Sequence, residues 1–181
     1  SPEVILYDFI CDLGFNHDQI KSMLDVVEPG KIFFSKSHKA VVDRNELIIV
    51  KSAKNDKTNI QFTSIEMLKN SSFFGDVSTN QMPIEINSGN NIEFFDFDKI
   101  SFPLTIRNWE YGDLFQPLGM KGKKKVSDFL INSKTSVLEK ENVLVMEQRN
   151  QILWLIGYRI DDRVKITSDT KKVLKIVTKD I

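Results

Sequence analysis

The sequence predicts an α+β fold, in which short helices are interspersed with strands that are mostly not parallel. Apolar residues recur at helical spacing in residues 1–30, and the spacing changes to alternation after Gly30. Beyond Lys99, short helical and strand-like segments follow one another. These changes predict three parts: a helical pair at 1–30 that ends a preceding domain, a β-rich segment at 31–98, and an α+β domain at 99–181.

Two helices are expected in the first part. An imperfect apolar face, formed by Val4, Ile5, Tyr7, Phe9 and Ile10, predicts the first helix. Gly14 is a natural stop for this helix, and Asn16 is expected to cap the second. The turn-forming pair Pro29-Gly30 is expected to end the second helix.

Strands dominate the middle of the chain. A strand is expected at 32–34, and the apolar runs 40–42 and 47–50 flank a polar turn at Asp43–Glu46, which predicts a hairpin. Further strands are expected at 59–62, 82–86 and 92–97, with the last two paired across Asn87–Asn91. Residues 64–81 fit a short helix around Ile65 or a loop.

The last part mixes short elements. Strands are expected at 104–109, 143–147, 152–156 and 163–166, and helices at 124–132 and 137–142. Ser136 and Glu139 form a capping box for the second of these helices. A final short helix is expected after Thr167 or Ser168, and the residues after Leu174 either extend as a strand or fray.

The composition is that of an ordinary globular chain, with 41% hydrophobic and 28% charged residues in 181. The longest apolar run, Ile152–Ile156, is far shorter than the ~20 residues of a membrane-spanning helix. The single cysteine, Cys11, excludes an internal disulfide. No secretory signal opens the chain, so we expect a cytoplasmic protein with no membrane partner.

Catalytic and metal-binding patterns are not found. His17 and His38 have no Cys, Asp or Glu at metal-like spacing, and Cys11 is interpreted as a small apolar residue. The sequence carries no Walker loop and no nucleophile-elbow motif. We therefore expect no catalytic residue, no metal and no cofactor in this chain.

Charge is divided unevenly between the two halves. Residues 1–98 hold nine basic and fifteen acidic side chains, and residues 99–181 hold sixteen basic and ten acidic ones. The formal balances are therefore −6 and +6. Such asymmetry favours a basic module that meets a polyanion. The alternative is that solvated surface lysines happen to fall late in the chain.

Four lysines form the most basic segment: Lys121, Lys123, Lys124 and Lys125. No acidic residue occurs from Leu114 to Ser127. A helix is expected to begin here, and the free N–H groups at such an end attract phosphate. The alternative is a solvated loop whose lysines serve solubility.

A loop of special backbone geometry is expected just before these lysines, because Trp109–Met120 combines aromatics, two glycines and a proline. Asp113 is expected to accept backbone N–H bonds in this loop or to pair with a nearby lysine.

The segment from Arg107 to Leu130 (RNWEYGDLFQPLGMKGKKKVSDFL) resembles the C-terminal domain of bacterial tRNA(Ile)-lysidine synthetases. Residues 154–167 (WLIGYRIDDRVKIT) resemble the second signature of that family, with Val164 where the family often has phenylalanine. Residues 33–39 and 94–100 resemble the stretch before that domain, and the likeness is most specific over about 99–174.

The resemblance implies a layered C-terminal domain with short helices, built around a β-sandwich and similar to a module of the phenylalanyl-tRNA synthetase β subunit. The full-length family uses ATP, with Mg²⁺, to attach lysine to the wobble cytidine of tRNA(Ile). The family's phosphate loop is absent here, so this region is expected to be inactive alone and to hold no cofactor. Its implied partners are tRNA(Ile) and its own catalytic domain.

On this interpretation, cationic side chains bind phosphates of the acceptor stem. The candidates are Lys121, Lys123, Lys124, Lys125 and Arg107, with Arg159 and Lys165 as weaker ones. Asp113, Ser127 and Asp128 are expected to shape the loop and cap the helix. The alternative is a protein-interaction module, in which the acidic half docks on the basic half of a second copy, as a homodimer, or on the catalytic domain.

Overall fold

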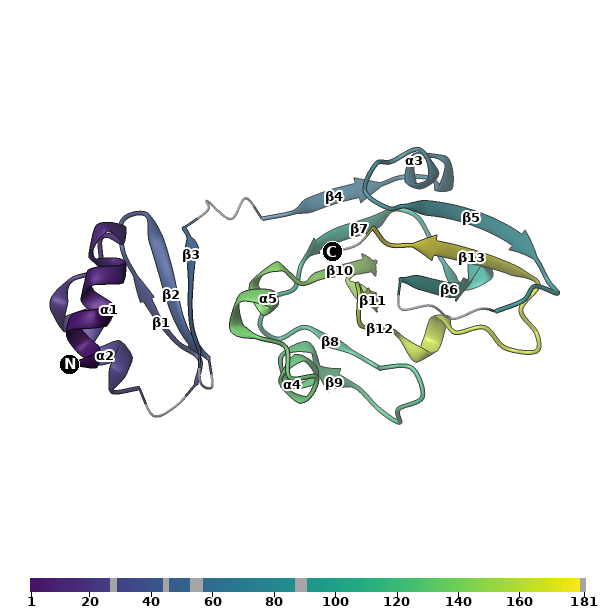
Figure 1. Ribbon diagram of the computed structural model, residues 1–181. Coiled ribbons are helices and arrows are strands. Elements are labelled where there is room, and N and C mark those ends of the chain that lie inside the picture. The colour runs from purple at the N-terminus through teal and green to yellow at the C-terminus, as the bar shows by residue number, and fades with distance from the viewer. Residues whose placement is uncertain (27–28, 44–45, 53–56, 87–90, 180–181) are drawn as a thin grey trace. The chain divides into compact units, whose positions relative to one another are not determined.

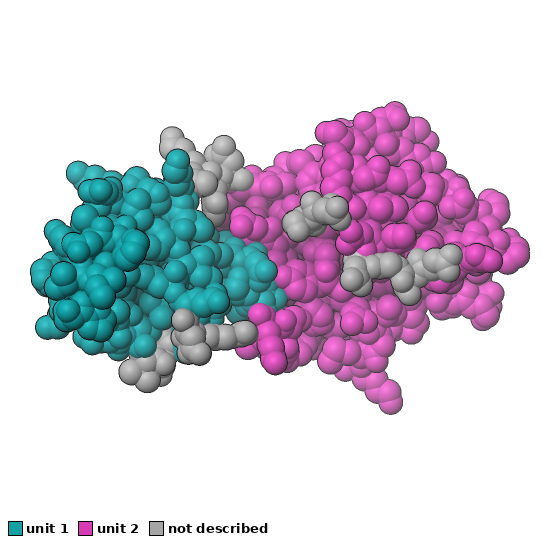
Figure 2. Space-filling view, in the orientation of Figure 1, with its two compact units in different colours: residues 1–56, 135–141 teal, residues 57–134, 142–181 magenta. Residues whose placement is uncertain are grey.

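The computed structural model describes the chain except for residues 27–28, 44–45, 53–56, 87–90 and 180–181. It forms two compact units, shown in different colours in Figure 2. Unit 1 contains residues 1–56 and 135–141, and unit 2 contains residues 57–134 and 142–181. The helical pair thus shares a unit with residues 31–56, whereas residues 57–98 belong with the C-terminal part, a division that differs from the three expected segments.

Unit 1 begins with the two predicted helices, α1 (Pro2–Ile10) and α2 (His17–Leu24). A short 3-10 helix extends α1 to Gly14, whose φ of 83° is the left-handed conformation that favours glycine. Asn16 caps α2 through a reciprocal capping box with Gln19. Helix α2 ends at Leu24, before the expected stop at Pro29.

Unit 1 also contains a three-stranded antiparallel sheet. Its strands are β1 (Lys31–Phe34), β2 (His38–Asp43) and β3 (Glu46–Lys51), in the order β1-β2-β3. The predicted hairpin is confirmed in its strands, and its turn residues 44–45 lie outside the described part. Ile20 and Ala40 are fully buried in the core that the helices and sheet share. Helix α5 (Val137–Asn142) begins with the predicted capping box of Ser136 and Glu139.

Unit 2 contains two larger antiparallel sheets (Figure 1). The five-stranded sheet has the order β12-β11-β10-β7-β4. Its strands are β4 (Asn59–Phe62), β7 (Leu104–Asn108), β10 (Leu144–Gln148), β11 (Gln151–Leu155) and β12 (Arg159–Ile160). The three-stranded sheet has the order β5-β13-β6, with β5 (Asp76–Gln81), β6 (Ile92–Asp96) and β13 (Lys172–Val177). Helix α3 (Ile65–Lys69) forms within the segment that the sequence left open between helix and loop.

The two sheets of unit 2 share one hydrophobic core. Phe95 and Leu174 of the smaller sheet join Ile106 and Trp154 of the larger sheet in this core. The ring centroids of Phe95 and Trp154 are 5.5 Å apart in an edge-to-face arrangement. The predicted α+β class with a β-sandwich is therefore confirmed. No helix in the described part of the chain is long and apolar enough to cross a membrane.

Two expectations for the end of the chain are wrong. The segment expected as a strand at 163–166 is largely a 3-10 turn, Asp162–Val164, because the amide and side chain of Arg163 bind the carboxylate of Asp161. The helix expected after Thr167 or Ser168 is a turn, in which the backbone amide of Thr167 donates to the hydroxyl of Thr170, and strand β13 follows it. The residues after Leu174 extend as a strand, one of the two alternatives that the sequence left open.

The expected hairpin of 82–86 with 92–97 is also wrong. Strand β6 forms, but it pairs with β13, and β5 pairs with the other edge of β13. The sequence of β5 is mostly polar and buries only Val77, so its strand character is weak in the sequence. Pro83 has no N–H to give to a ladder, which disfavours a strand at 82–86.

A buried carboxylate, Asp96, makes the stability of this sheet depend on pH. Asp96 is 4% exposed and lies at the end of β6. Burial raises the pKa of Asp96, but hydrogen bonds from Lys99 and from Thr170, whose hydroxyl donates at 2.8 Å, outweigh it and lower the pKa. Because the folded-state pKa lies below the ordinary value of about 3.9, the stabilisation is present above that value and is lost as pH falls through the folded-state pKa.

We therefore expect Asp96→Asn to lower the free energy of unfolding by about 1–2 kcal/mol at pH 7 and by less at pH 3. Urea denaturation followed by tryptophan fluorescence measures both values. Asp98→Asn is the control, because Asp98 lies two residues away and faces no such set of donors in the described part of the chain. An equal loss at both pH values would contradict the assignment.

Candidate nucleic-acid interface

The four lysines lie on a β-hairpin, which we call the lysine hairpin (residues 114–125). Strand β8 (Leu114–Phe115) pairs with β9 (Lys124–Lys125) in antiparallel register. Phe115 is fully buried and packs edge to face on Phe129 of the following helix, α4 (Val126–Asn132), with 5.2 Å between ring centroids. The hairpin is thus fixed at its base, and residues 119–123 of its loop are exposed.

The helix expected from Lys124 begins two residues later, because Lys124 and Lys125 pair as a strand. Lys125 occupies the N-cap position of α4, and no side chain caps this helix. Ser127 and Asp128 lie in its first turn, where the hydroxyl of Ser127 donates to Asp128 at 3.4 Å.

The positive charge of the lysine hairpin is available to a partner. Lys121, Lys123 and Lys125 are exposed, and the ammonium of the half-buried Lys124 lies 5.8 Å from the centre of the Phe129 ring. None of the four lysines forms an ion pair with a carboxylate of the described residues. An anionic ligand would therefore compete with no carboxylate among those residues.

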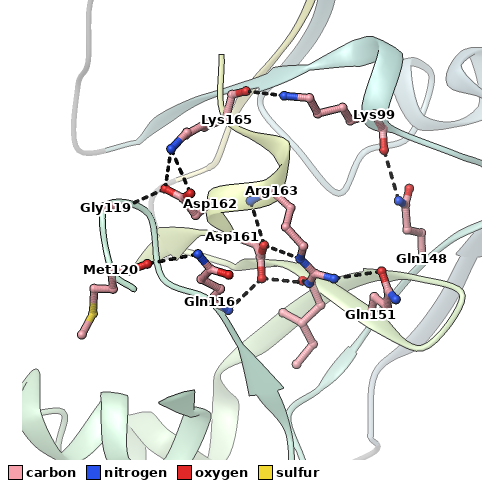
Figure 3. Close-up of polar contacts among 11 residues, drawn as sticks. Lys99, Gln116, Gly119, Met120, Gln148, Gln151, Asp161, Asp162, Arg163 and Lys165 are labelled. Atoms are coloured by element: carbon pink, nitrogen blue, oxygen red, sulfur yellow. Dashed lines mark hydrogen bonds and ion pairs between the residues drawn. The ribbon is translucent and has the colours of Figure 1, made fainter. Parts of the chain in front are cut away.

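A buried carboxylate anchors the loop of the lysine hairpin (Figure 3). Asp161 is fully buried, and its carboxylate accepts a hydrogen bond from the backbone N–H of Gln116 at 2.8 Å. It also binds the guanidinium of Arg163 through both oxygens, at 2.7 and 2.9 Å. This hydrogen bonding raises the pKa of Arg163 despite its partial burial. The segment around β12 therefore holds the start of the loop in place.

The neighbouring Asp162 makes a second attachment. Its carboxylate accepts the amide of Gly119 at 2.9 Å and the ammonium of Lys165 at 2.9 Å, and both contacts lower its pKa. Gly119 has a φ of 81°, so the loop turns through a conformation that suits glycine. Lys165 thus lies beside the loop with its charge already paired to Asp162.

Arg159 also lies next to the hairpin. It is exposed on β12, one residue before Ile160, whose carbonyl accepts the amide of Leu118 at 2.9 Å. The structure therefore brings Lys165 and Arg159 to the loop that precedes the four lysines.

Arg107 is different, because its guanidinium is fully engaged inside unit 2. It forms a bidentate pair with Asp113, at 2.9 Å for both bonds, and donates twice to Glu147, at 2.8 and 3.1 Å. The fifth N–H binds the carbonyl of Asn108. These contacts raise the pKa of Arg107 and use all five of its donors. Arg107 has no donor left for a phosphate.

Asp113 completes this arrangement by fixing the turn before the hairpin. One oxygen of its carboxylate accepts the amide of Glu110 at 2.7 Å. Its partner is thus Arg107 and the backbone, not a lysine.

Three anchoring residues escaped the sequence interpretation: Asp161, Asp162 and Glu147. The signal for the first two was the run Asp161-Asp162-Arg163, which mixes charges of both signs within one signature segment. Glu147 carried no local signal, because its partner Arg107 is forty residues away in sequence. No cluster of His, Cys, Asp and Glu suited to a metal occurs among the described residues.

Comparisons with known proteins point to one family. A domain model described as the TilS substrate binding domain matches residues 1–52, and one described as the TilS substrate C-terminal domain matches residues 104–176. The tRNA(Ile)-lysidine synthase of Parabacteroides distasonis is 39% identical over 185 residues, which cover 96% of this chain and 41% of that protein. That of Bacteroides thetaiotaomicron is 35% identical over 176 residues, covering 96% of this chain and 39% of that protein.

The chain therefore spans about two fifths of the length of these relatives. Among solved structures, a "TILS C-terminal domain" matches with a TM-score of 0.49 and 20% identity, covering 59% of this chain and 84% of that one.

Proposed function

The chain belongs to the tRNA(Ile)-lysidine synthase family, and from this premise we propose that it is the C-terminal, substrate-recognising part of such an enzyme and binds the acceptor-stem side of tRNA(Ile). The ATP-dependent attachment of lysine to the wobble cytidine belongs, on this proposal, to a catalytic domain outside the chain, which is its partner. On the same proposal, the chain acts in the cytoplasm.

The observation that carries this proposal is the lysine hairpin. Its four lysines have no carboxylate partner among the described residues, and its loop is held by Asp161 and Asp162. A double-stranded RNA is recognised mainly through its phosphates, 2′-hydroxyls and shape, which suits a group of cations on an anchored loop. Arg159 on β12 would extend the contact. Lys165 is a weaker candidate, because its ammonium pairs with Asp162, and Arg107 is not part of the contact.

The test is binding of the chain to a tRNA(Ile) acceptor-stem minihelix, measured at several salt concentrations. The variant replaces the three exposed lysines of the hairpin, Lys121, Lys123 and Lys125, with alanine. We expect affinity to fall about 10- to 100-fold near 0.1 M salt. The slope of log K against log salt should become shallower by about two to three units, because each lost phosphate contact removes about one unit.

A matched control replaces three other exposed lysines of unit 2, Lys69, Lys171 and Lys179, with alanine. This control changes the net charge by the same amount as the hairpin variant. If the hairpin is a specific site, the control should bind the minihelix with an affinity within a few-fold of that of the parent. Equal loss in both triple variants would point to general electrostatic attraction. Unchanged affinity and slope in the hairpin variant would refute the proposed site.

A further inference from the structure

An aromatic side chain that is almost fully exposed to solvent lies just before the lysine hairpin in the chain. Tyr111 is 92% exposed and lies in the turn between β7 and β8. Its ring centroid is 5.4 Å from that of Trp109, with the two planes inclined by 49°. Exposing a tyrosine this far leaves a large apolar surface in water, and packing within the described part of unit 2 does not account for its position.

The turn that carries Tyr111 is rigidly held. The amide of Asp113 donates to the carbonyl of Glu110 at 3.1 Å, while the carboxylate of Asp113 accepts the amide of Glu110. That carboxylate is itself fixed by the bidentate pair with Arg107. Gly112 turns the chain with a φ of 97°. The ring is therefore presented on a fixed backbone, which lowers the entropic cost of binding a flat ligand.

Two exposed lysines, Lys125 and Lys57, lie near the turn. The amide of Val126 donates to the carbonyl of Asp113 at 2.9 Å, so the exposed Lys125 is one residue from a contact with the turn. The ammonium of the exposed Lys57 lies 3.6 Å from the carboxylate of Glu110, which belongs to the turn. A ligand on the ring would thus meet positive charge where it continues towards the hairpin.

We propose that Tyr111, supported by Trp109, stacks on an unpaired base of an RNA whose adjoining duplex is held by the lysine hairpin. An exposed ring beside free lysines suits a nucleotide, since every base has a π-face and each is joined to a phosphate. An apolar protein partner would be expected to need a contiguous apolar patch, whereas the charged residues Glu110, Lys57 and Lys125 lie on or near the turn that carries this ring. The inference rests on the proposed function and adds a single-stranded element to it.

The experiment compares two RNAs: the tRNA(Ile) acceptor-stem minihelix with its single-stranded 3′ end, and the same minihelix trimmed to a blunt end. We expect the parent chain to bind the overhanging RNA about tenfold more tightly than the blunt one, in the range found for stacking of one base. Tyr111→Ala should bind both RNAs with the affinity of the blunt one. Tyr111→Phe keeps the ring and should retain most of the preference.

Tyr7→Ala is the matched control, because Tyr7 is an exposed tyrosine of unit 1 and should leave the preference unchanged. If Tyr111→Ala still prefers the overhang, or if the parent shows no preference while binding both RNAs in a salt-dependent way, the stacking proposal fails and the proposed function stands. If the parent binds neither RNA, both proposals fail.

Discussion

Replacing Arg107 with methionine is expected to lower the free energy of unfolding of unit 2 by about 2–4 kcal/mol. The side chains of Arg107, Asp113 and Glu147 are only 20%, 14% and 13% exposed. Removing the arginine leaves two poorly hydrated carboxylates close together with their main donor gone, and such a loss costs more than the pair contributes when complete. Partial exposure of all three groups keeps the figure below that of a fully buried triad.

Urea denaturation followed by tryptophan fluorescence measures this loss directly. Both tryptophans of the chain, Trp109 and Trp154, lie in unit 2, so their emission reports on the unit that carries Arg107. Arg107→Lys is the informative companion, because it keeps the charge but not the planar fork that spans two carboxylates. We expect it to recover less than half of the loss. A methionine variant within 0.5 kcal/mol of the parent would show that the three groups contribute nothing net.

The same variant separates Arg107 from the RNA contact. Because all five of its donors are used internally, a folded methionine variant should keep the salt slope of RNA binding. A slope shallower by one unit would instead indicate a direct phosphate contact by Arg107.

Local signals in the sequence predicted much of the fold. Asn16 as a cap, and Ser136 with Glu139 as a capping box, act within one helical turn, so these contacts could be predicted from local spacing. The antiparallel hairpin of β2 and β3 likewise joins neighbouring segments. Each of these interactions closes within a few residues, and no distant part of the chain decides it.

The misjudged elements depend on distant partners. Strand β13 enters the sheet between β5 and β6, so β6, which was expected to pair with residues 82–86, pairs with the end of the chain. The sequence predicts that a helix begins at Lys124, but Lys124 and Lys125 form a β-strand that pairs with Leu114–Phe115. The helix begins only after this strand. Residue spacing carries no information about such competition.

In the candidate site, the sequence likewise could not show which charged residues pair with one another. The basic half of the sequence indicated where cations gather, but not which of them are already neutralised. Arg107, Arg163 and Lys165 each face a carboxylate, whereas the hairpin lysines face none among the described residues. Composition therefore indicated the basic segment, and only the pairing of acids with bases separates the cations that face a carboxylate from those that face none among the described residues.

The second large effect is expected at Asp161, whose replacement by alanine should destabilise unit 2 by about 2–4 kcal/mol. Four donors converge on this fully buried carboxylate: the amides of Gln116 and Arg163, and two N–H groups of the Arg163 guanidinium. Alanine leaves all four without their acceptor. The side chain of Arg163 is 37% exposed and recovers part of its hydration, which limits the cost.

Asp161→Asn should lose nearly as much as the alanine variant, although its shape is unchanged. The amide group retains one acceptor oxygen but turns an NH₂ towards the guanidinium of Arg163, so a charge-assisted bidentate pair is replaced by donor facing donor. Asp169→Ala, at an exposed aspartate nearby in sequence, is the control and should change stability by less than about 0.5 kcal/mol.

Replacing Asp161 should also affect the lysine hairpin, because this carboxylate holds the start of its loop. Asp161 therefore links the stability of unit 2 to RNA binding. Without the carboxylate, the amide of Gln116 loses its acceptor, and hydrogen exchange should accelerate across residues 114–125 while the lysines themselves are unchanged. Affinity for the minihelix should then fall about three- to tenfold with little change in salt slope, because the number of phosphate contacts is kept and only their pre-organisation is lost. Faster exchange with unaltered affinity would mean that the lysines bind from a flexible loop, and the anchoring role assigned to Asp161 would be limited to stability.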